Sequence, residues 1–76
     1  MPTVLQIDGF EVMIYPNDHN PPHVHVFRAE GEVIINIDDS AVRDAWEVKG
    51  KDIRRAQQIV EQNRDFLMQK WDELHP

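Results

Sequence analysis

The sequence predicts an α+β fold: an antiparallel sheet of four strands, with a fifth left open, built from two hairpins and covered on one face by one long C-terminal helix. Apolar and polar residues alternate up to about residue 38, and turn-forming residues interrupt the alternation. From about residue 50 the apolar residues recur at helical spacing instead. The 76 residues suffice for one core, so we expect a single domain over residues 1–76.

The first hairpin is predicted from a two-residue turn. Residues 3–7 and 10–15 flank Asp8-Gly9, a pair that suits a type I′ turn because both central residues need a positive φ. A two-residue loop fixes the register and pairs Ile7 with Phe10, Leu5 with Val12, and Thr3 with Ile14. The side of the hairpin that carries these residues is expected to face the core.

The second hairpin follows a proline pair. Pro21-Pro22 favours an extended entry into a strand over residues 23–28. Glu30-Gly31 is interpreted as a tight turn into a strand over residues 32–38. The resulting register pairs Ala29 with Glu32, Phe27 with Ile34, His25 with Asn36, and His23 with Asp38. It places the valines of the third strand on the core side and both histidines on the opposite side.

The C-terminal third is predicted to form the helix. Its apolar residues fall on one arc at 3.6 residues per turn: Ile53, Ala56, Ile59, Val60, Phe66, Leu67, Trp71 and Leu74. The predicted core contains Leu5, Ile7, Phe10, Val12, Val24, Val26, Ile35, Val60, Leu67 and Trp71. Residues 39–49 fit either a short helix capped by Ser40 or an extended segment, and the pattern does not decide between them.

The composition excludes several classes of protein. The chain has no cysteine, which excludes a disulfide scaffold, thiol catalysis and cysteine-based zinc sites. The net charge of −6 disfavours binding of RNA through overall charge. No apolar run approaches the roughly 18 residues of a membrane span, and no leader-like segment precedes the first strand. We therefore expect a cytoplasmic protein without a membrane contact, and we expect no cofactor.

Two histidines form the centre of the candidate site. His23 and His25 lie two positions apart on one strand, so their side chains point to the same face, together with Phe27. Paired imidazoles can act as general acid and base in phosphodiester cleavage. They can also hold a divalent ion if a further ligand joins them. The candidates for that ligand are Asp38, His19 and Asp18.

A basic cluster marks the start of the predicted helix. It comprises Lys49, Lys51, Arg54 and Arg55, half of the chain's basic residues within seven positions. Cations and free backbone N–H groups at a helix start can bind an anion. The simpler interpretation is that these charges are solvated or paired with neighbouring acidic residues.

Asn63 lies in the middle of the apolar arc. A buried amide without a partner costs roughly 1–3 kcal/mol, so we expect it to form a hydrogen bond. The partner is expected in the loop over residues 17–22, at His23 or in the backbone beside it. The amide then either ties the helix to the sheet or orients a histidine.

Three segments carry a family resemblance. They are Met1-Pro2-Thr3-Val4-Leu5 with Ile7-Asp8-Gly9, Pro21-Pro22-His23-Val24-His25-Val26, and Ile59-Val60-Glu61-Gln62-Asn63-Arg64. The chain resembles a family of small prokaryotic proteins known as domain of unknown function 4160, over nearly its whole length. Residues 39–48 match least well. The resemblance implies a two-gene, toxin–antitoxin-like setting and draws attention to His23, His25 and Asn63.

Three functions remain open. The preferred one is a protein-binding module whose histidine face, anchored by Phe27 and Ile34, docks the small protein encoded by a neighbouring gene. An alternative is a small ribonuclease with His23 and His25 as acid and base and Lys51, Arg54 or Arg55 on the phosphate. A second alternative is a divalent-metal-binding module, with His23, His25 and Asp38 as ligands. Whether the protein is an enzyme is left undecided, as is a homodimer.

Overall fold

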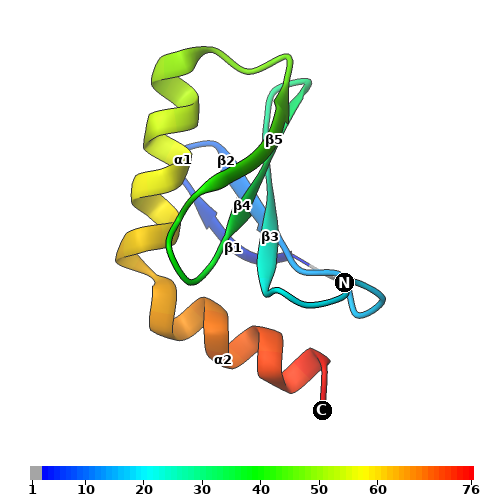
Figure 1. Cartoon of the computed structure of the whole chain (residues 1–76). Coiled ribbons are helices and arrows are strands. Elements are labelled where there is room, and N and C mark those ends of the chain that lie inside the picture. Colours follow the sequence, from blue (N-terminus) through cyan, green and yellow to red (C-terminus); the bar gives the residue numbers. More distant parts are fainter. Residues whose placement is uncertain (1–2) are drawn as a thin grey trace.

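The computed structural model describes residues 3–76, which form a five-stranded antiparallel sheet followed by two helices (Figure 1). The strands are β1 (Thr3–Ile7), β2 (Phe10–Met13), β3 (His23–Arg28), β4 (Gly31–Asn36) and β5 (Val42–Trp46). They lie side by side in sequence order. The helices are α1 (Gly50–Gln62) and α2 (Arg64–Leu74). The predicted α+β class is confirmed, and the fifth strand that the prediction left open is present.

The first hairpin has the predicted turn. Asp8 and Gly9 both have positive φ angles, 52° and 81°. The predicted pairs Leu5 with Val12 and Ile7 with Phe10 are confirmed. The third pair is wrong, because an irregularity between Thr3 and Leu5 shifts the register and pairs Thr3 with Met13.

The second hairpin turns earlier than predicted. Arg28 pairs with Gly31, so Ala29 and Glu30 form the turn, with a φ of 53° at Ala29. The observed pairs include Phe27 with Glu32, His25 with Ile34, and His23 with Asn36. The register therefore differs from the predicted one by two residues. Because a shift of two preserves which face each side chain occupies, the predicted sorting of valines and histidines still holds.

Gly31 misled the prediction because its small size serves packing, not a turn. A Cβ atom at Gly31 would lie 2.2 Å from the Glu47 carbonyl oxygen and 2.4 Å from a Val48 methyl carbon. The segment after β5 thus crosses directly over the start of β4. Gly31 is a strand residue that leaves room for this crossing.

The undecided segment forms a strand. Val42–Trp46 pairs with β4 and makes the edge of the sheet. Val42 and Trp46 remain exposed, at 38% and 44% of their surfaces, while Ala45 packs against the core. The extended alternative is therefore correct.

The single long helix of the prediction is wrong, because the helix breaks at Asn63. The backbone N–H of Asn63 bonds to the carbonyl oxygens of Ile59 and Val60, and its φ of −119° leaves the helical range. Its side-chain amide donates to the same Ile59 carbonyl at 2.8 Å. Asn63 thus ends α1, and its own carbonyl accepts from Leu67 to begin α2.

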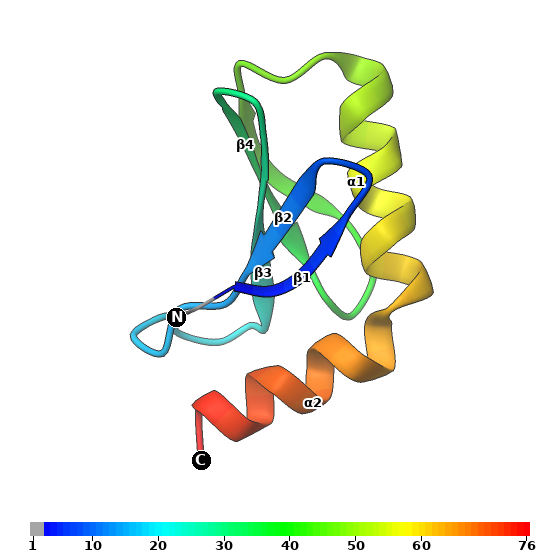
Figure 2. The same ribbon diagram turned by 180° about the vertical axis from the view of Figure 1, so that it is seen from behind.

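The break lets the two helices cover different parts of the sheet. α1 lies along one face, while α2 turns away and runs past one end of the sheet (Figures 1 and 2). The core between these layers contains Phe10, Val12, Ile14, Val24, Val26, Val33, Ile35, Ile37, Ala56, Ile59, Val60, Leu67 and Trp71. Of the predicted core, Leu5 and Ile7 are only half-buried at its margin. Phe66, predicted on the buried arc, is exposed.

Among the residues that the structure describes, no helix has the length and apolar character needed to cross a membrane.

Candidate functional site

The candidate site lies on the face of the sheet opposite α1, near the end of β3 where the chain enters that strand. His23 and His25 share this face because they are two positions apart on β3. The segment that connects β2 to β3 folds back beside them, with a backbone hydrogen bond from Asp18 to the Tyr15 carbonyl. This turn brings the Asp18 side chain to both histidines.

One carboxylate oxygen of Asp18 meets both imidazoles. Asp18 Oδ2 lies 3.2 Å from His23 Nε2 and 2.9 Å from His25 Nε2. The His23 side chain is 9% exposed and that of His25 is 14% exposed. The three side chains form the group of potential metal ligands in the described chain, with donor atoms within 4.8 Å of one another.

The other nitrogen of each imidazole has its own acceptor. His23 Nδ1 lies 2.9 Å from the Pro21 carbonyl oxygen, and His25 Nδ1 lies 2.7 Å from Glu32 Oε2. A carbonyl oxygen or a carboxylate can only accept, so both Nδ1 atoms carry a hydrogen. Both Nε2 atoms face the same Asp18 oxygen, which accepts a hydrogen from an Nε2 that carries one and lies opposite the lone pair of an Nε2 that does not.

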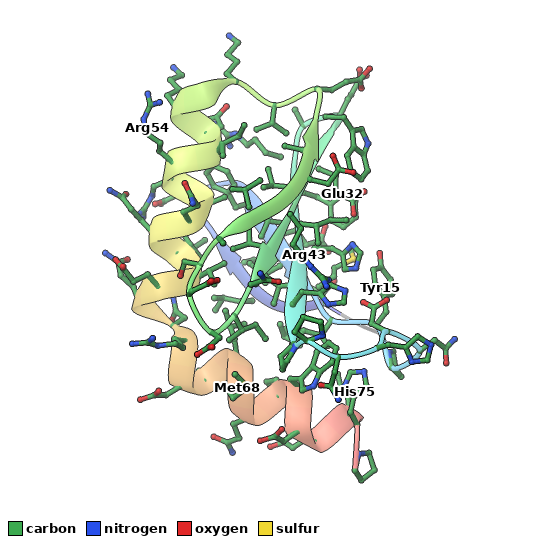
Figure 3. All side chains as sticks on the ribbon, in the orientation of Figure 1. Tyr15, Glu32, Arg43, Arg54, Met68 and His75 are labelled. Atoms are coloured by element: carbon green, nitrogen blue, oxygen red, sulfur yellow. The ribbon has the colours of Figure 1, made fainter. Side chains whose placement is uncertain are left out.

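Aromatic rings surround the pair. Tyr15 packs edge-on against His25 with ring centres 4.7 Å apart, and Trp71 of α2 lies 5.4 Å from His23. His75 stacks on Trp71 at 3.7 Å, and its ring nitrogens face the Trp71 and Tyr15 carbonyl oxygens. Figure 3 shows Tyr15 and His75 together at the same end of the molecule. The contact of His75 with the Tyr15 carbonyl thus holds the end of α2 beside the site.

The Tyr15 phenol lies near several carboxylates, and its pKa is raised. Burial raises the pKa of Tyr15 above its usual value, and the carboxylates Glu32, Asp18 and Glu11 raise it further. The phenol oxygen lies 3.4 Å from the Met13 sulfur and donates to it. Tyr15 therefore stays protonated at neutral pH and can act as a hydrogen-bond donor.

Asp38 is not the carboxylate that joins the histidines. Its side chain is exposed, and its carbonyl oxygen accepts a hydrogen bond from Arg64. The predicted pairing of His23 with Asp38 failed with the register of the second hairpin, since Asn36 occupies that position. His19, another candidate ligand, is exposed and lies outside the group of potential ligands.

The basic cluster does not meet the histidines either. Arg55 pairs with Asp8 at 2.7 Å, at the tip of the first hairpin. In Figure 3, Arg54 lies near the start of α1, at the opposite end of the molecule from Tyr15 and His75. The arrangement predicted for a ribonuclease, with the cations beside the acid and base, is therefore not assembled.

Asn63 contacts other residues than predicted, whereas Phe27 lies on the predicted face of the sheet. The Asn63 amide bonds to Ile59 within its own helix, so the expectation that it contacts residues 17–22 or His23 is wrong. Phe27 shares the histidine face but is half-buried, opposite Glu32. Within residues 3–76, neither residue forms a hydrogen bond with His23 or His25.

A comparison with protein families found a match. The family model described as a domain of unknown function (DUF4160) matches residues 9–72. The chain belongs to this family. The matched region of DUF4160 contains Asp18, both β3 histidines, Glu32 and Trp71, and its description names no activity. A comparison with curated proteins and one with solved structures found no match.

Sequence reasoning missed the roles of Glu32 and Tyr15 and left Asp18 as one of three candidate ligands. Glu32 was assigned to the strand but not to His25, because the predicted register put it two residues too far along β3. Nothing in the sequence indicated the contact of Tyr15 with His25. Asp18 was named only as one of several ligands. Its proximity to the His-Val-His segment was the available signal, since five residues allow a tight return.

Proposed function

We propose that this protein binds a divalent metal ion through Asp18 Oδ2, His23 Nε2 and His25 Nε2. The observation that carries the proposal is the orientation of the two imidazoles. Each gives its Nδ1 hydrogen to an acceptor and turns Nε2 toward the same Asp18 oxygen, at 3.2 and 2.9 Å. In neutral rings with the hydrogen on Nδ1, two Nε2 lone pairs and a carboxylate oxygen would repel one another unless a positive charge lay among them.

The environment of the histidines supports a metal ion as that charge. Histidines that bind metals almost always donate the other ring N–H to a carboxylate or a backbone carbonyl, which fixes the ring and its tautomer. His25 has the carboxylate of Glu32 in this role, and His23 has the carbonyl of Pro21. Both kinds of support thus occur at one site.

The donor set favours particular metals. Two imidazole nitrogens and one carboxylate oxygen suit Zn²⁺, Co²⁺ or Ni²⁺, whereas Mg²⁺ and Ca²⁺ prefer oxygen ligands throughout. We therefore expect Zn²⁺ to bind more tightly than Mg²⁺. The competing arrangement is a pair of protonated imidazoles bridged by Asp18, which would need no metal.

Calorimetric titration of chelator-treated protein with Zn²⁺ tests the proposal. We expect one equivalent to bind, and Asp18→Asn and His25→Gln to weaken binding at least tenfold. His19→Ala is the matched control, because it removes an exposed histidine next to Asp18 without touching the three ligands. The proposal would be contradicted if titration of the wild type with Zn²⁺ released or absorbed no heat of binding. It would also be contradicted if His19→Ala lost as much Zn²⁺ affinity as Asp18→Asn.

Folding must be checked in the same variants. His23 is buried against Trp71, so its replacement can disturb packing as well as a ligand. For this reason Asp18→Asn, whose side chain keeps its size, is the decisive variant. Its metal-free thermal melt should stay close to that of the wild type while its Zn²⁺ affinity falls.

Docking of a partner protein is a second proposal, supported by a separate surface. Trp46 and Val42 are exposed on the edge strand β5, and tryptophan often anchors protein interfaces. The proposed partner is the small protein encoded by a neighbouring gene. Trp46→Ala should weaken that complex at least tenfold and leave Zn²⁺ binding unchanged. Equal affinity of wild type and variant for the co-expressed partner would exclude this surface.

A further inference from the structure

We propose that the metal centre keeps one coordination position open to solution and that a small anionic oxygen ligand, of the carboxylate or hydroxamate class, binds there. This inference rests on the proposed metal binding. It adds that the centre exchanges ligands, as a catalytic metal site does, in place of being closed by four protein side chains.

The first argument is the number and origin of the ligands. All three donors come from residues 18–25, two from one face of β3 and one from the turn beside it. Within residues 3–76, these are the three donors that the structure brings together. Zn²⁺ and Co²⁺ take four or more ligands, so at least one position faces away from the protein donors.

The second argument is that neighbouring donors are already engaged. Glu32 Oε2 holds the His25 N–H at 2.7 Å, and both ring nitrogens of His75 face backbone carbonyl oxygens at 2.8 and 3.1 Å. The Tyr15 phenol donates to the Met13 sulfur at 3.4 Å, so it is engaged away from the three ligands. Within residues 3–76, the group of ligands within reach thus stays at three.

The third argument is access and charge. The Asp18 side chain is 24% exposed, whereas those of His23 and His25 are 9% and 14% exposed, so solution reaches the ion past Asp18. A divalent ion held by two neutral imidazoles and one carboxylate keeps one positive charge within its own ligand set, because the Glu32 carboxylate lies behind His25 and does not coordinate. A monoanion that enters from solution neutralises that charge, whereas a neutral ligand does not. Acetate and acetohydroxamate are therefore suitable probes.

The test uses the full chain loaded with Co²⁺, whose visible absorption spectrum reports its ligands. Titration with acetate or acetohydroxamate should change the spectrum in a saturable way that fits one site. Co²⁺ should remain bound to the protein, as dialysis followed by metal analysis would show. A spectrum that does not respond while Co²⁺ stays bound would overturn the inference and identify a closed site.

Two variants separate the remaining outcomes. His19→Ala should leave the spectrum and the anion titration unchanged; a changed spectrum would show that His19 closes the site, and the inference would fail. Glu32→Gln, which keeps an acceptor for His25, should weaken Co²⁺ binding about 10–100-fold while the loaded protein still responds to the anion. If the wild type binds no Co²⁺ and no Zn²⁺, the proposed function itself fails together with this inference.

Discussion

At Gly31 the structure admits no side chain larger than hydrogen, because the Glu47 carbonyl and the Val48 side chain lie directly above it. Gly31→Ala should therefore lower the free energy of unfolding by about 1–3 kcal/mol, the usual cost of overpacking. Urea denaturation measures this change.

Gly50→Ala is the matched control for Gly31→Ala. A Cβ atom at Gly50 would meet only the Arg54 guanidinium at 3.5 Å, an ordinary contact, and alanine favours the helix that begins there. This variant should be neutral or more stable by up to about 1 kcal/mol. Equal destabilisation of both variants would show that the crossing over β4 is not tight.

The buried amide oxygen of Asn36 has no hydrogen-bond partner among residues 3–76. Such an atom loses its hydration on folding and gains nothing in return. Asn36→Leu, similar in shape, should therefore raise the free energy of unfolding by about 1 kcal/mol. Asn36→Asp, which buries a charge at the same place, should lower it. A thermal melt of Asn36→Leu below that of the wild type would indicate that the oxygen has a partner.

Tyr15 gives a pH dependence with a definite sign. Its pKa in the folded protein is raised by burial and by Glu32, Asp18 and Glu11, so the folded state holds the phenolic proton more tightly than the unfolded state. The contribution to stability is complete below the unfolded pKa of about 10 and is lost as pH rises through the folded pKa. Stability should thus fall in alkaline solution, and less so in Tyr15→Phe.

A spectroscopic titration checks the cause directly. Tyr15 is the single tyrosine of the chain, so the phenolate band reports one residue. Its midpoint should lie above 10 in folded protein and near 10 in urea. A folded midpoint at or below the urea value would contradict the direction.

At the scale of elements, the sequence predicted local turns well and packing poorly. Asp8-Gly9 adopts the positive φ angles that these residue types favour in a two-residue hairpin turn, so the first hairpin was predictable. Glu30-Gly31 looked equally clear but failed, because the glycine is required by a segment that arrives later in the chain. The predicted faces of the β3 and β4 side chains were still correct, because a register shift of two residues leaves each side chain on the same face.

The helix break shows a second limit of pattern reading. Val60, Leu67 and Trp71 keep helical spacing across Asn63, so periodicity alone indicates one continuous helix. The bend arises because the Asn63 side chain competes for the Ile59 carbonyl. The site was limited in the same way: the shared face of the histidines followed from alternation, whereas Asp18 and Glu32 depended on a loop path and a register.

The turn that carries Asp18 should respond to metal. Residues 16, 17 and 19–21 are exposed, and Asp18 reaches the histidines from among them. Zn²⁺ should fix this segment, so we expect slower hydrogen exchange in residues 16–20 on metal addition. The turn around Ser40, outside the site, should not change. If bound Zn²⁺ slowed hydrogen exchange in residues 16–20 no more than around Ser40, Asp18 would not be a ligand.

For the whole molecule, a ligand that binds only the folded state raises stability by mass action. Zn²⁺ at about 100 times its dissociation constant should add about 2.7 kcal/mol to the free energy of unfolding. Asp18→Asn should lose most of this increment, and His19→Ala should retain it. Thermal melts at several Zn²⁺ concentrations measure the effect. A melting temperature independent of Zn²⁺ in the wild type would exclude preferential binding to the folded protein.

The strand order β1-β2-β3-β4-β5 has a consequence for how fast the chain folds. Each strand pairs with its neighbours in sequence, so no strand must find a partner across a long intervening segment. Closure of short loops costs little entropy, and proteins rich in local contacts fold faster than those with distant strand pairings. The sheet can therefore grow one hairpin at a time, and the ligand triad, confined to residues 18–25, can assemble before either helix docks.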